Sequence, residues 1–329
     1  MDEAKIIEVS DGEDGSRLDK WLKKHVPSMP NSLMYKLFRK RAFKVDGKRA
    51  KADYKLIAGQ SVRIPPMEER EINERKKEYR VSDYDRKMIR SSILFEDEHI
   101  IAINKPAGLA VQGGTNTKRH LDGIVTALVG KNETPPKIVH RLDKDTSGVM
   151  LLAKTDKAAR ELGFMFKGKD IRKCYWALTV PAPDMDNGTI RGAIRKAGGE
   201  GKEKMIIDEE KGKKSTTEFV IIDRAHNKAA FVAFWPRTGR THQIRVHAAQ
   251  ALGTPILGDG KYGGKGAFLE GDLEIPKKVH LHARNISLNH PLKNGRIDVT
   301  APLPDDMIRS WKELGFNPNH KGDPFKGIE

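Results

Sequence analysis

Residues 140–153 read HRLDKDTSGVMLLA, a polar and charge-dense segment that runs directly into an apolar run of strand length. This pattern predicts that Asp143 lies in a loop at the end of a buried strand, where loops often carry functional side chains. The alternative is a capped turn, in which the polar side chains of the loop bond to their own backbone. The segments that accompany this loop further along the chain favour the functional interpretation.

Length and composition indicate a soluble globular protein with one large domain and one small one. The chain has 329 residues, of which 37% are hydrophobic and 32% are charged. It has no run of 18 or more apolar residues and an acidic N-terminus without an apolar signal core, so we expect no membrane span and a cytoplasmic location. Its single cysteine, Cys174, excludes an internal disulfide and a cysteine-caged zinc site.

The formal net charge of +16 predicts a polyanionic partner, and nucleic acid is the commonest one. An anionic membrane is the alternative, but we find no amphipathic helix with an aromatic-rich apolar face. The charge is unevenly distributed. Residues 16–64 hold 14 Lys and Arg against three Asp, which is +11 of the total. This segment is therefore the first candidate for an RNA contact.

Residues 16–66 are predicted to form a small domain of two short helices and a hairpin. Apolar residues at helical spacing follow Ser16 and again follow Asn31, with Pro27 and Pro30 between them, and Asp46-Gly47 is a tight hairpin signal. Basic residues lie off the apolar stripe and are the candidates for RNA binding: Lys36, Arg39, Lys40, Arg41 and Lys44. The alternative is a solvated surface whose lysines only aid solubility.

The remaining boundaries follow from composition. Residues 1–15 are expected to be an N-terminal segment, and residues 67–90 a charged linker in which apolar residues are sparse. Residues 91–310 form the predicted large domain, and residues 311–329 a C-terminal tail. Within the large domain, strand signals outnumber helix signals and do not alternate with them. We therefore predict an α+β fold with a largely antiparallel mixed sheet flanked by helices and loops, not a doubly wound one.

A second dense motif, RTGRTHQIRVH, occupies residues 237–247. It predicts a turn followed by a helix over residues 241–252, with several donors in an anion-friendly first turn. His242 and His247 are five residues apart, which is the wrong spacing for two metal ligands on one helical face, and no H-E-x-x-H motif is present. No phosphate-binding glycine motif in its proper context is found either. We expect neither a metal nor a nucleotide cofactor.

Five motifs in order together resemble the RluA-type pseudouridine synthases: residues 104–108 (NKPAG), 140–148, 173–177 (KCYWA), 238–245 (TGRTHQIR) and 262–263 (YG). The small basic domain is similar to the S4 (αL-type) RNA-binding domain. The resemblance implies the pseudouridine synthase fold and a site-specific isomerisation of uridine without a cofactor. Residues 110–114 (AVQGG) are similar to those of family members that modify large-subunit rRNA, although a His is usual where Gln112 stands.

The family resemblance also implies roles for individual residues. Asp143 would be the single catalytic carboxylate, Arg245 its ion-pair partner, and Tyr175 the side chain against a flipped base. The alternatives are a surface arginine on a basic helix and a core aromatic on a strand. His140 and Arg141 would fill the gap in the RNA or hold phosphates, and two further residues are candidates for contacts with RNA: Lys105, which could equally be solvated, and Arg240.

The predicted substrate is 23S rRNA, free or in an assembling large subunit, with the protein acting as a monomer without a protein partner. Two other functions stay open. One is a non-catalytic rRNA-binding or assembly factor, against which the presence of Asp143, Tyr175 and Arg245 together speaks. The other is a tRNA pseudouridine synthase, which the S4-like domain and the residues around Gly113 disfavour.

Overall fold

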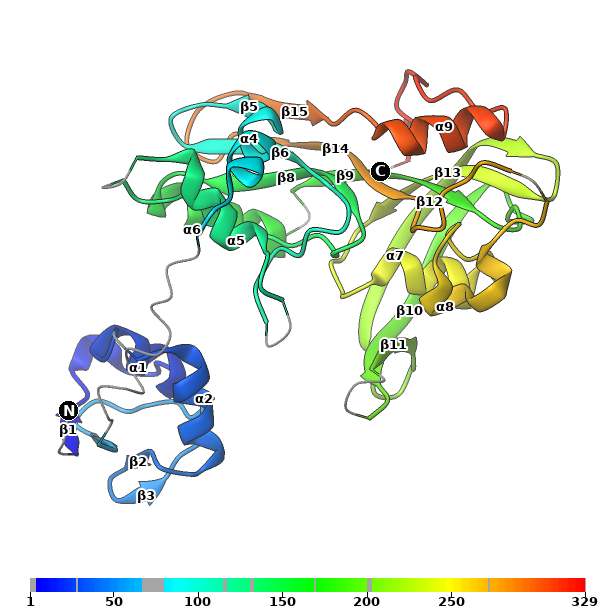
Figure 1. Cartoon of the computed structure of the whole chain (residues 1–329). Coiled ribbons are helices and arrows are strands. Elements are labelled where there is room, and N and C mark those ends of the chain that lie inside the picture. The colour runs from blue at the N-terminus through cyan, green and yellow to red at the C-terminus, as the bar shows by residue number, and fades with distance from the viewer. Residues whose placement is uncertain are drawn as a thin grey trace. The chain divides into compact units, whose positions relative to one another are not determined.

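The computed structural model describes residues 4–27, 29–66, 80–114, 117–130, 133–168, 170–199, 203–271 and 273–328. The chain divides into two compact units, Met1–Arg80 and Val81–Glu329 (Figure 1). Most of the predicted linker, residues 67–79, lies outside the described residues. Its last part differs from the prediction, because Asp83–Ser91 forms helix α4 of the second unit, with Ser82 as its N-cap.

In its described residues, the first unit has two α-helices and a four-stranded sheet with the strand order β1-β4-β2-β3. The predicted helices and hairpin are present, and the hairpin turns at Asp46 and Gly47, both with positive φ. Residues 1–15 were predicted to be a separate segment, but β1 pairs with β4. The elements are β1 (Lys5–Glu8), η1 (Asp11–Glu13), α1 (Leu18–His25), α2 (Asn31–Arg39), β2 (Lys44–Val45), β3 (Lys48–Arg49) and β4 (Ser61–Ile64).

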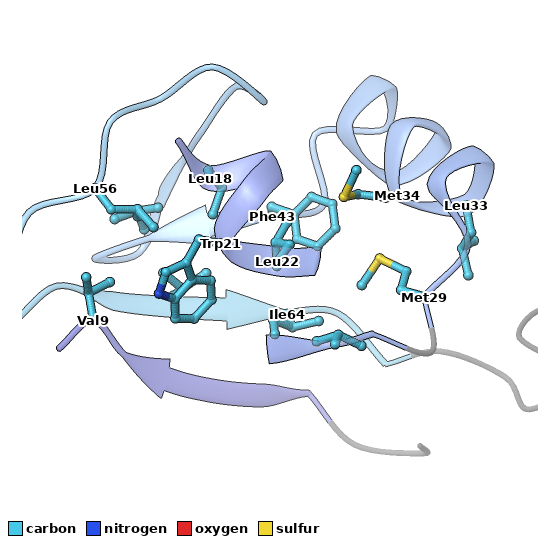
Figure 2. Packing of buried hydrophobic residues seen from close by; sticks show 13 residues of the cluster. Val9, Leu18, Trp21, Leu22, Met29, Leu33, Met34, Phe43, Leu56 and Ile64 are labelled. Carbon is cyan, nitrogen blue, oxygen red and sulfur yellow. The ribbon is translucent and has the colours of Figure 1, made fainter. Parts of the chain in front are cut away.

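An apolar core holds this unit together. Trp21 and Leu22 of α1 and Met34 of α2 pack with Phe43 and strand residues such as Ile64, as Figure 2 shows. Burying each large side chain of this kind contributes roughly 1.5–3 kcal/mol. The core of this unit is thus formed by the apolar residues at helical spacing that predicted the two helices, together with apolar strand residues.

The second unit is built on one long mixed sheet, with eleven strands among the described residues (Figure 1). The main path runs β11-β10-β12-β13-β9-β14-β8-β6-β5, while β15 pairs with β14 and β7 with β8. All pairs are antiparallel except β14 with β8, which confirms the predicted α+β class. The strands are β5 (Ile93–Glu96), β6 (Ile100–Lys105), β7 (Lys137–Ile138), β8 (Ser147–Ala153), β9 (Arg172–Thr179), β10 (Asn187–Ala197), β11 (Lys204–Ile207), β12 (Lys213–Ala225), β13 (Ala229–Pro236), β14 (Leu281–Asn289) and β15 (Arg296–Thr300).

Helices cover both faces of this sheet. Every residue of β8 and β13 is buried, as expected for strands covered on both sides. Alternate residues of β13 belong to different cores: Phe231 packs with α9, and Val232 with α7. The helices are α5 (Leu121–Ile124), η2 (Val125–Leu128), α6 (Asp156–Lys167), α7 (Gln243–Val246), the π-helical η3 (His247–Ala251), α8 (Gly260–Gly263), η4 (Gly264–Ala267) and α9 (Asp305–Glu313).

The predicted C-terminal tail is part of this fold. Trp311 of α9 is fully buried and packs edge-on against Phe231 at a ring-centroid distance of 5.3 Å, and Phe316 and Phe325 are buried in the same core. The aromatic residues of 311–329 thus close one face of the sheet. No helix in the described part of the chain is long and apolar enough to cross a membrane.

Candidate active site

Asp143 lies in the loop that leads into β8, as predicted. The backbone carbonyl of Asp143 accepts a hydrogen bond from the N–H of Thr146 at 3.1 Å, which makes the loop a tight turn. The Asp143 carboxylate does not cap this turn. It is 26% exposed and lines a cavity of about 530 Å³. The capped-turn alternative therefore does not describe the Asp143 side chain.

The loop is fixed at its C-terminal end by Gly148. Gly148 has φ +110°, and a Cβ at this position would lie 2.2 Å from the carbonyl oxygen of Ala283. Ser147 and Gly148 pair in parallel with His282 and Ala283 of β14, and the Ser147 hydroxyl hydrogen-bonds His282 Nδ1 at 2.8 Å. Only glycine permits this close approach of β8 and β14, which places the loop beside β14.

Lys105 fixes the other side of the loop, which corrects the prediction that it contacts phosphate or is solvated. Its side chain is fully buried, and Nζ donates to the carbonyl oxygens of Pro106, Leu109 and Lys144 at 2.9, 2.9 and 3.3 Å. Burial lowers the pKa of Lys105 to about 7, an effect that Asp143 and Asp145 oppose. Lys105 thus ties its own turn to the Asp143 loop.

Tyr175 of β9 lies in the same cavity as Asp143. Burial, with a contribution from the Asp143 charge, raises the pKa of the Tyr175 hydroxyl well above its usual range. The phenol therefore remains protonated near neutral pH.

The cavity is lined by residues from both halves of the sheet: Gln112, Ile138–Asp143, Thr146, Phe166, Lys173, Tyr175, Pro236, Thr238–Thr241, Gln243, Ile244 and Leu281.

Arg245 is not the ion-pair partner of Asp143 that we predicted. Within the described residues, its side-chain hydrogen bonds go to Asp259, from Nε to Oδ2 and from Nη2 to Oδ1, each 2.7 Å long. The Arg245 and Asp259 side chains are only 4% and 1% exposed. Asp143 lies close enough to contribute to the raised pKa of Arg245. Arg245 thus belongs to a buried pair behind Asp143.

His242 connects this pair to the Asp143 loop. Its backbone is left-handed, with φ +54°, which is uncommon for a residue other than glycine. The ring hydrogen-bonds the Tyr262 hydroxyl through Nδ1 at 2.6 Å, and Nε2 lies 3.9 Å from Asp143 Oδ1. Burial lowers the pKa of His242, so the ring is neutral near pH 7 and its contact with Asp143 is not an ion pair.

The other predicted RNA contacts in this unit differ in exposure. His140 stacks on Phe166 at 4.2 Å between ring centroids, and its Nε2 accepts the N–H of Leu151 at 2.8 Å. Burial lowers the pKa of His140 to about 3, so the ring is neutral near pH 7 in the protein without RNA, and its contact with RNA stays a prediction. Arg141 and Arg240 are exposed and line the cavity.

The predicted RNA-binding residues of the first unit lie at the C-terminal end of α2 and just beyond it. Lys36, Arg39, Lys40 and Arg41 are exposed, and Lys44 is partly buried in β2. Their concentration in nine residues, all of one sign, makes a basic surface that is suited to a polyanion. We call this surface, Lys36–Lys44, the α2 basic patch.

Motif reading alone missed three residues near Asp143. Asp259 lies outside the motifs that predicted the site, and only the fold shows that it pairs with Arg245. His242 was considered only as a metal ligand. Lys173 belongs to the motif at residues 173–177. Its spacing of two residues from Tyr175 along a strand places both side chains on the same face, and both line the cavity. Among the described residues, no group of three or more His, Cys, Asp or Glu could hold a metal ion.

Comparison with known proteins identifies the class. Residues 99–250 match the family described as RNA pseudouridylate synthase, and this range contains Asp143, Tyr175 and Arg245. The chain belongs to this family, in its RluA-type branch, as the sequence motifs predicted. It is therefore a pseudouridine synthase, an isomerase.

Particular relatives extend the similarity over most of the chain. It is 34% identical to ribosomal large subunit pseudouridine synthase C of Escherichia coli O157:H7, over 94% of this chain and 96% of that protein. It is also 34% identical to the enzyme of the same name from Rickettsia typhi, over 88% and 94%. Among solved structures, human RNA pseudouridylate synthase domain containing 4 is 28% identical, with a TM-score of 0.58 over 70% of this chain and 95% of that one.

Proposed function

We propose that this protein converts uridine to pseudouridine in 23S rRNA of the large ribosomal subunit, with Asp143 as the catalytic carboxylate. The observation that carries the proposal is the placement of the Asp143 carboxylate at the wall of a cavity of about 530 Å³ that it shares with Tyr175. This volume is in the range of small-ligand pockets and suits one nucleotide. The names of the relatives supply the substrate.

A uridine in a stacked helix is inaccessible, so the target nucleotide must be flipped into the cavity. The N1–C1′ bond then breaks, the uracil turns, and a C5–C1′ bond forms. The C5 proton is lost and N1 gains a proton, so the reaction is an isomerisation without a redox change. A carboxylate beside C1′ stabilises the charge that develops on the sugar, as in glycosidases.

The surrounding residues would hold Asp143 for this step. Lys105 binds the loop at the carbonyl of Lys144, Gly148 fixes its C-terminal end, and His242 Nε2 lies 3.9 Å from Asp143 Oδ1. Tyr175 would lie against the uracil. Because its pKa is raised, we assign Tyr175 a contact role as a neutral phenol, not that of the resting base.

The α2 basic patch would supply RNA affinity and site choice, in keeping with the S4-like arrangement of its helices. Arg141 and Arg240, exposed at the cavity, would contact the backbone near the flipped nucleotide. A ribosomal RNA substrate would place the protein in the cytoplasm. We propose that it acts as a monomer on rRNA or on an assembling subunit.

Pseudouridine mapping in a deletion strain tests the function. Chemical adduct formation followed by primer extension on 23S rRNA and on tRNA should show stops that disappear from 23S rRNA on deletion. Wild-type enzyme should restore them and the Asp143→Asn variant should not. Loss of stops in tRNA alone would favour the tRNA synthase alternative, and restoration by the Asp143→Asn variant would favour a non-catalytic assembly factor.

A further inference from the structure

Lys173 occupies a position in the cavity that the proposed mechanism does not use. It is two residues before Tyr175 in β9, so both side chains project from the same face of the strand, and both line the cavity with Asp143. The strand is held on both sides near this point, because Tyr175 pairs with Phe234 of β13 and Lys173 with Ile286 of β14. The position of Lys173 is thus set by the sheet and not by a mobile loop.

The charge of Lys173 is not balanced within the described residues. Its ammonium makes no hydrogen bond or ion pair there, in contrast to Lys105 with its three carbonyl oxygens and Arg245 with Asp259. Burial is the cause that lowers the pKa of Lys173, with no acidic group opposing it. The nearby His140 is neutral. A partly buried cation without a counter-charge is costly unless an anion arrives.

We propose that the Lys173 ammonium binds a negatively charged oxygen of the flipped uridine nucleotide. This inference rests on the proposed function. Two oxygens of the nucleotide have the required chemistry. One is a phosphate oxygen, which is charged in the bound ground state. The other is a uracil carbonyl oxygen, which gains negative charge as the N1–C1′ electron pair moves into the departing ring. Lys173 keeps its protons in both cases and acts as a hydrogen-bond donor.

The two sources predict different effects of Lys173→Met, a change that keeps an apolar stem and removes the charge. Affinity is measured by filter binding across a salt series, and chemistry by single-turnover tritium release from C5-labelled 23S rRNA. Loss of a phosphate contact should raise Kd and flatten the slope of log K against log salt by roughly 0.7–0.9, with the saturating rate unchanged. Loss of a contact to the uracil oxygen should leave Kd and slope unchanged and lower the saturating rate by roughly 10²–10³-fold.

Matched variants complete the test. Lys173→Arg should recover part of the affinity or of the saturating rate, whichever Lys173→Met lowers, because it restores the charge. Lys213→Met changes an exposed strand lysine that does not line the cavity, and should behave as wild type. Urea unfolding of each variant shows whether it folds, and Lys173→Gln replaces the methionine variant if that one does not. A folded variant with neutral residue 173 and wild-type Kd, slope and rate would overturn the inference. A wild type that releases no more tritium than Asp143→Asn would overturn the proposed function itself.

Discussion

Arg245 and Asp259 form a bidentate ion pair of two 2.7 Å hydrogen bonds that is almost completely removed from solvent. Arg245 lies with its guanidinium carbon 5.2 Å from the centre of the Tyr262 ring, and Tyr262 in turn hydrogen-bonds His242, whose other nitrogen faces Asp143. Tyr262 and His242 thus connect the buried Arg245–Asp259 pair to the Asp143 carboxylate. We propose from these contacts that Arg245 helps to position Asp143.

Removing one partner of this pair should destabilise the protein strongly. Asp259→Ala leaves the Arg245 charge buried and unpaired, and we expect a loss of about 3–5 kcal/mol in the free energy of unfolding. Urea unfolding measures it. The double variant Arg245→Met/Asp259→Leu should recover much of this stability, because both charges are absent, but not the activity. A single variant as stable as wild type would show that the pair is not buried in solution.

Arg245→Lys tests positioning separately from charge. A lysine offers a point contact where the planar guanidinium makes two parallel hydrogen bonds, so Asp259 would be held loosely. We expect the single-turnover rate to fall while RNA affinity is retained. An equal loss of affinity and rate would instead indicate a direct contact between Arg245 and RNA.

Asp143→Asn should abolish tritium release from C5-labelled rRNA, by at least about 10²–10³-fold, with little change in RNA affinity. The amide keeps the shape of the side chain and removes the negative charge needed as the glycosidic bond breaks. Asp145→Asn is the matched control, since Asp145 is an exposed acidic residue of the same loop that does not line the cavity. Comparable rates for the two variants would refute the assignment of Asp143.

Three buried histidines should make the catalytic unit sensitive to acid. His247, His280 and His282 are fully buried, and burial lowers the pKa of each from 6.5 to about 4. Between these values the unfolded chain binds more protons, so stability is complete above about pH 6.5 and is lost as the pH falls toward 4. Each histidine should contribute a slope of up to about 1.4 kcal/mol per pH unit.

The contribution of one histidine can be isolated with His282→Gln, which cannot titrate in this range. Urea unfolding at intervals from pH 4 to 7.5 should show that the free energy of unfolding falls less steeply with decreasing pH than in wild type. The difference in slope should correspond to the uptake of about one proton fewer on unfolding. His226→Asn is the control, because His226 is exposed and has a positive φ that Asn tolerates. An identical pH slope in wild type and His282→Gln would contradict the prediction.

The α2 basic patch should supply much of the salt-dependent affinity for RNA. Reversing Arg39, Lys40 and Arg41 to Glu should flatten the slope of log K against log salt by about two to three units, if each residue neutralises one phosphate. A control triple reversal on the second unit, at the exposed Lys277, Lys312 and Lys321, should change the slope less. Filter binding to rRNA fragments measures both. An equal change in the two triple variants would mean that net charge alone matters.

The sequence predicted the elements in which buried residues form a regular apolar pattern along the chain. The continuous apolar run of residues 149–153 indicated the buried strand β8, and the stripes of α1 and α2 indicated a small helical unit. The C-terminal tail was a wrong prediction, because Met307, Trp311, Phe316 and Phe325 are spread among polar residues. The i, i+4 spacing of the first two is nevertheless the signal of an apolar face in α9.

The site was less accessible from sequence because its partners are distant in the chain. Lys105 stands between two residues typical of a turn and reads as exposed, whereas the fold surrounds it with three carbonyl oxygens, one from Lys144. Arg245 likewise pairs with Asp259 and not with Asp143 because of the path of the chain between residues 245 and 259, which the sequence pattern does not reveal. Residue types indicated Asp143 and Tyr175, which line the cavity, but only the fold shows that Lys105 and Arg245 make buried contacts outside its lining.

The sheet order also sets when the protein can become active during its synthesis. Strand β14, residues 281–289, lies between β9, which carries Tyr175, and β8, which follows Asp143. A nascent chain that has released Tyr175 from the ribosome must therefore wait for more than one hundred further residues before the two halves of the cavity can join. At elongation speeds of about 5–20 residues per second this delay is on the order of ten seconds. An enzyme whose proposed substrate is ribosomal RNA would thus be unable to assemble its cavity until β14 has left the ribosome that makes it.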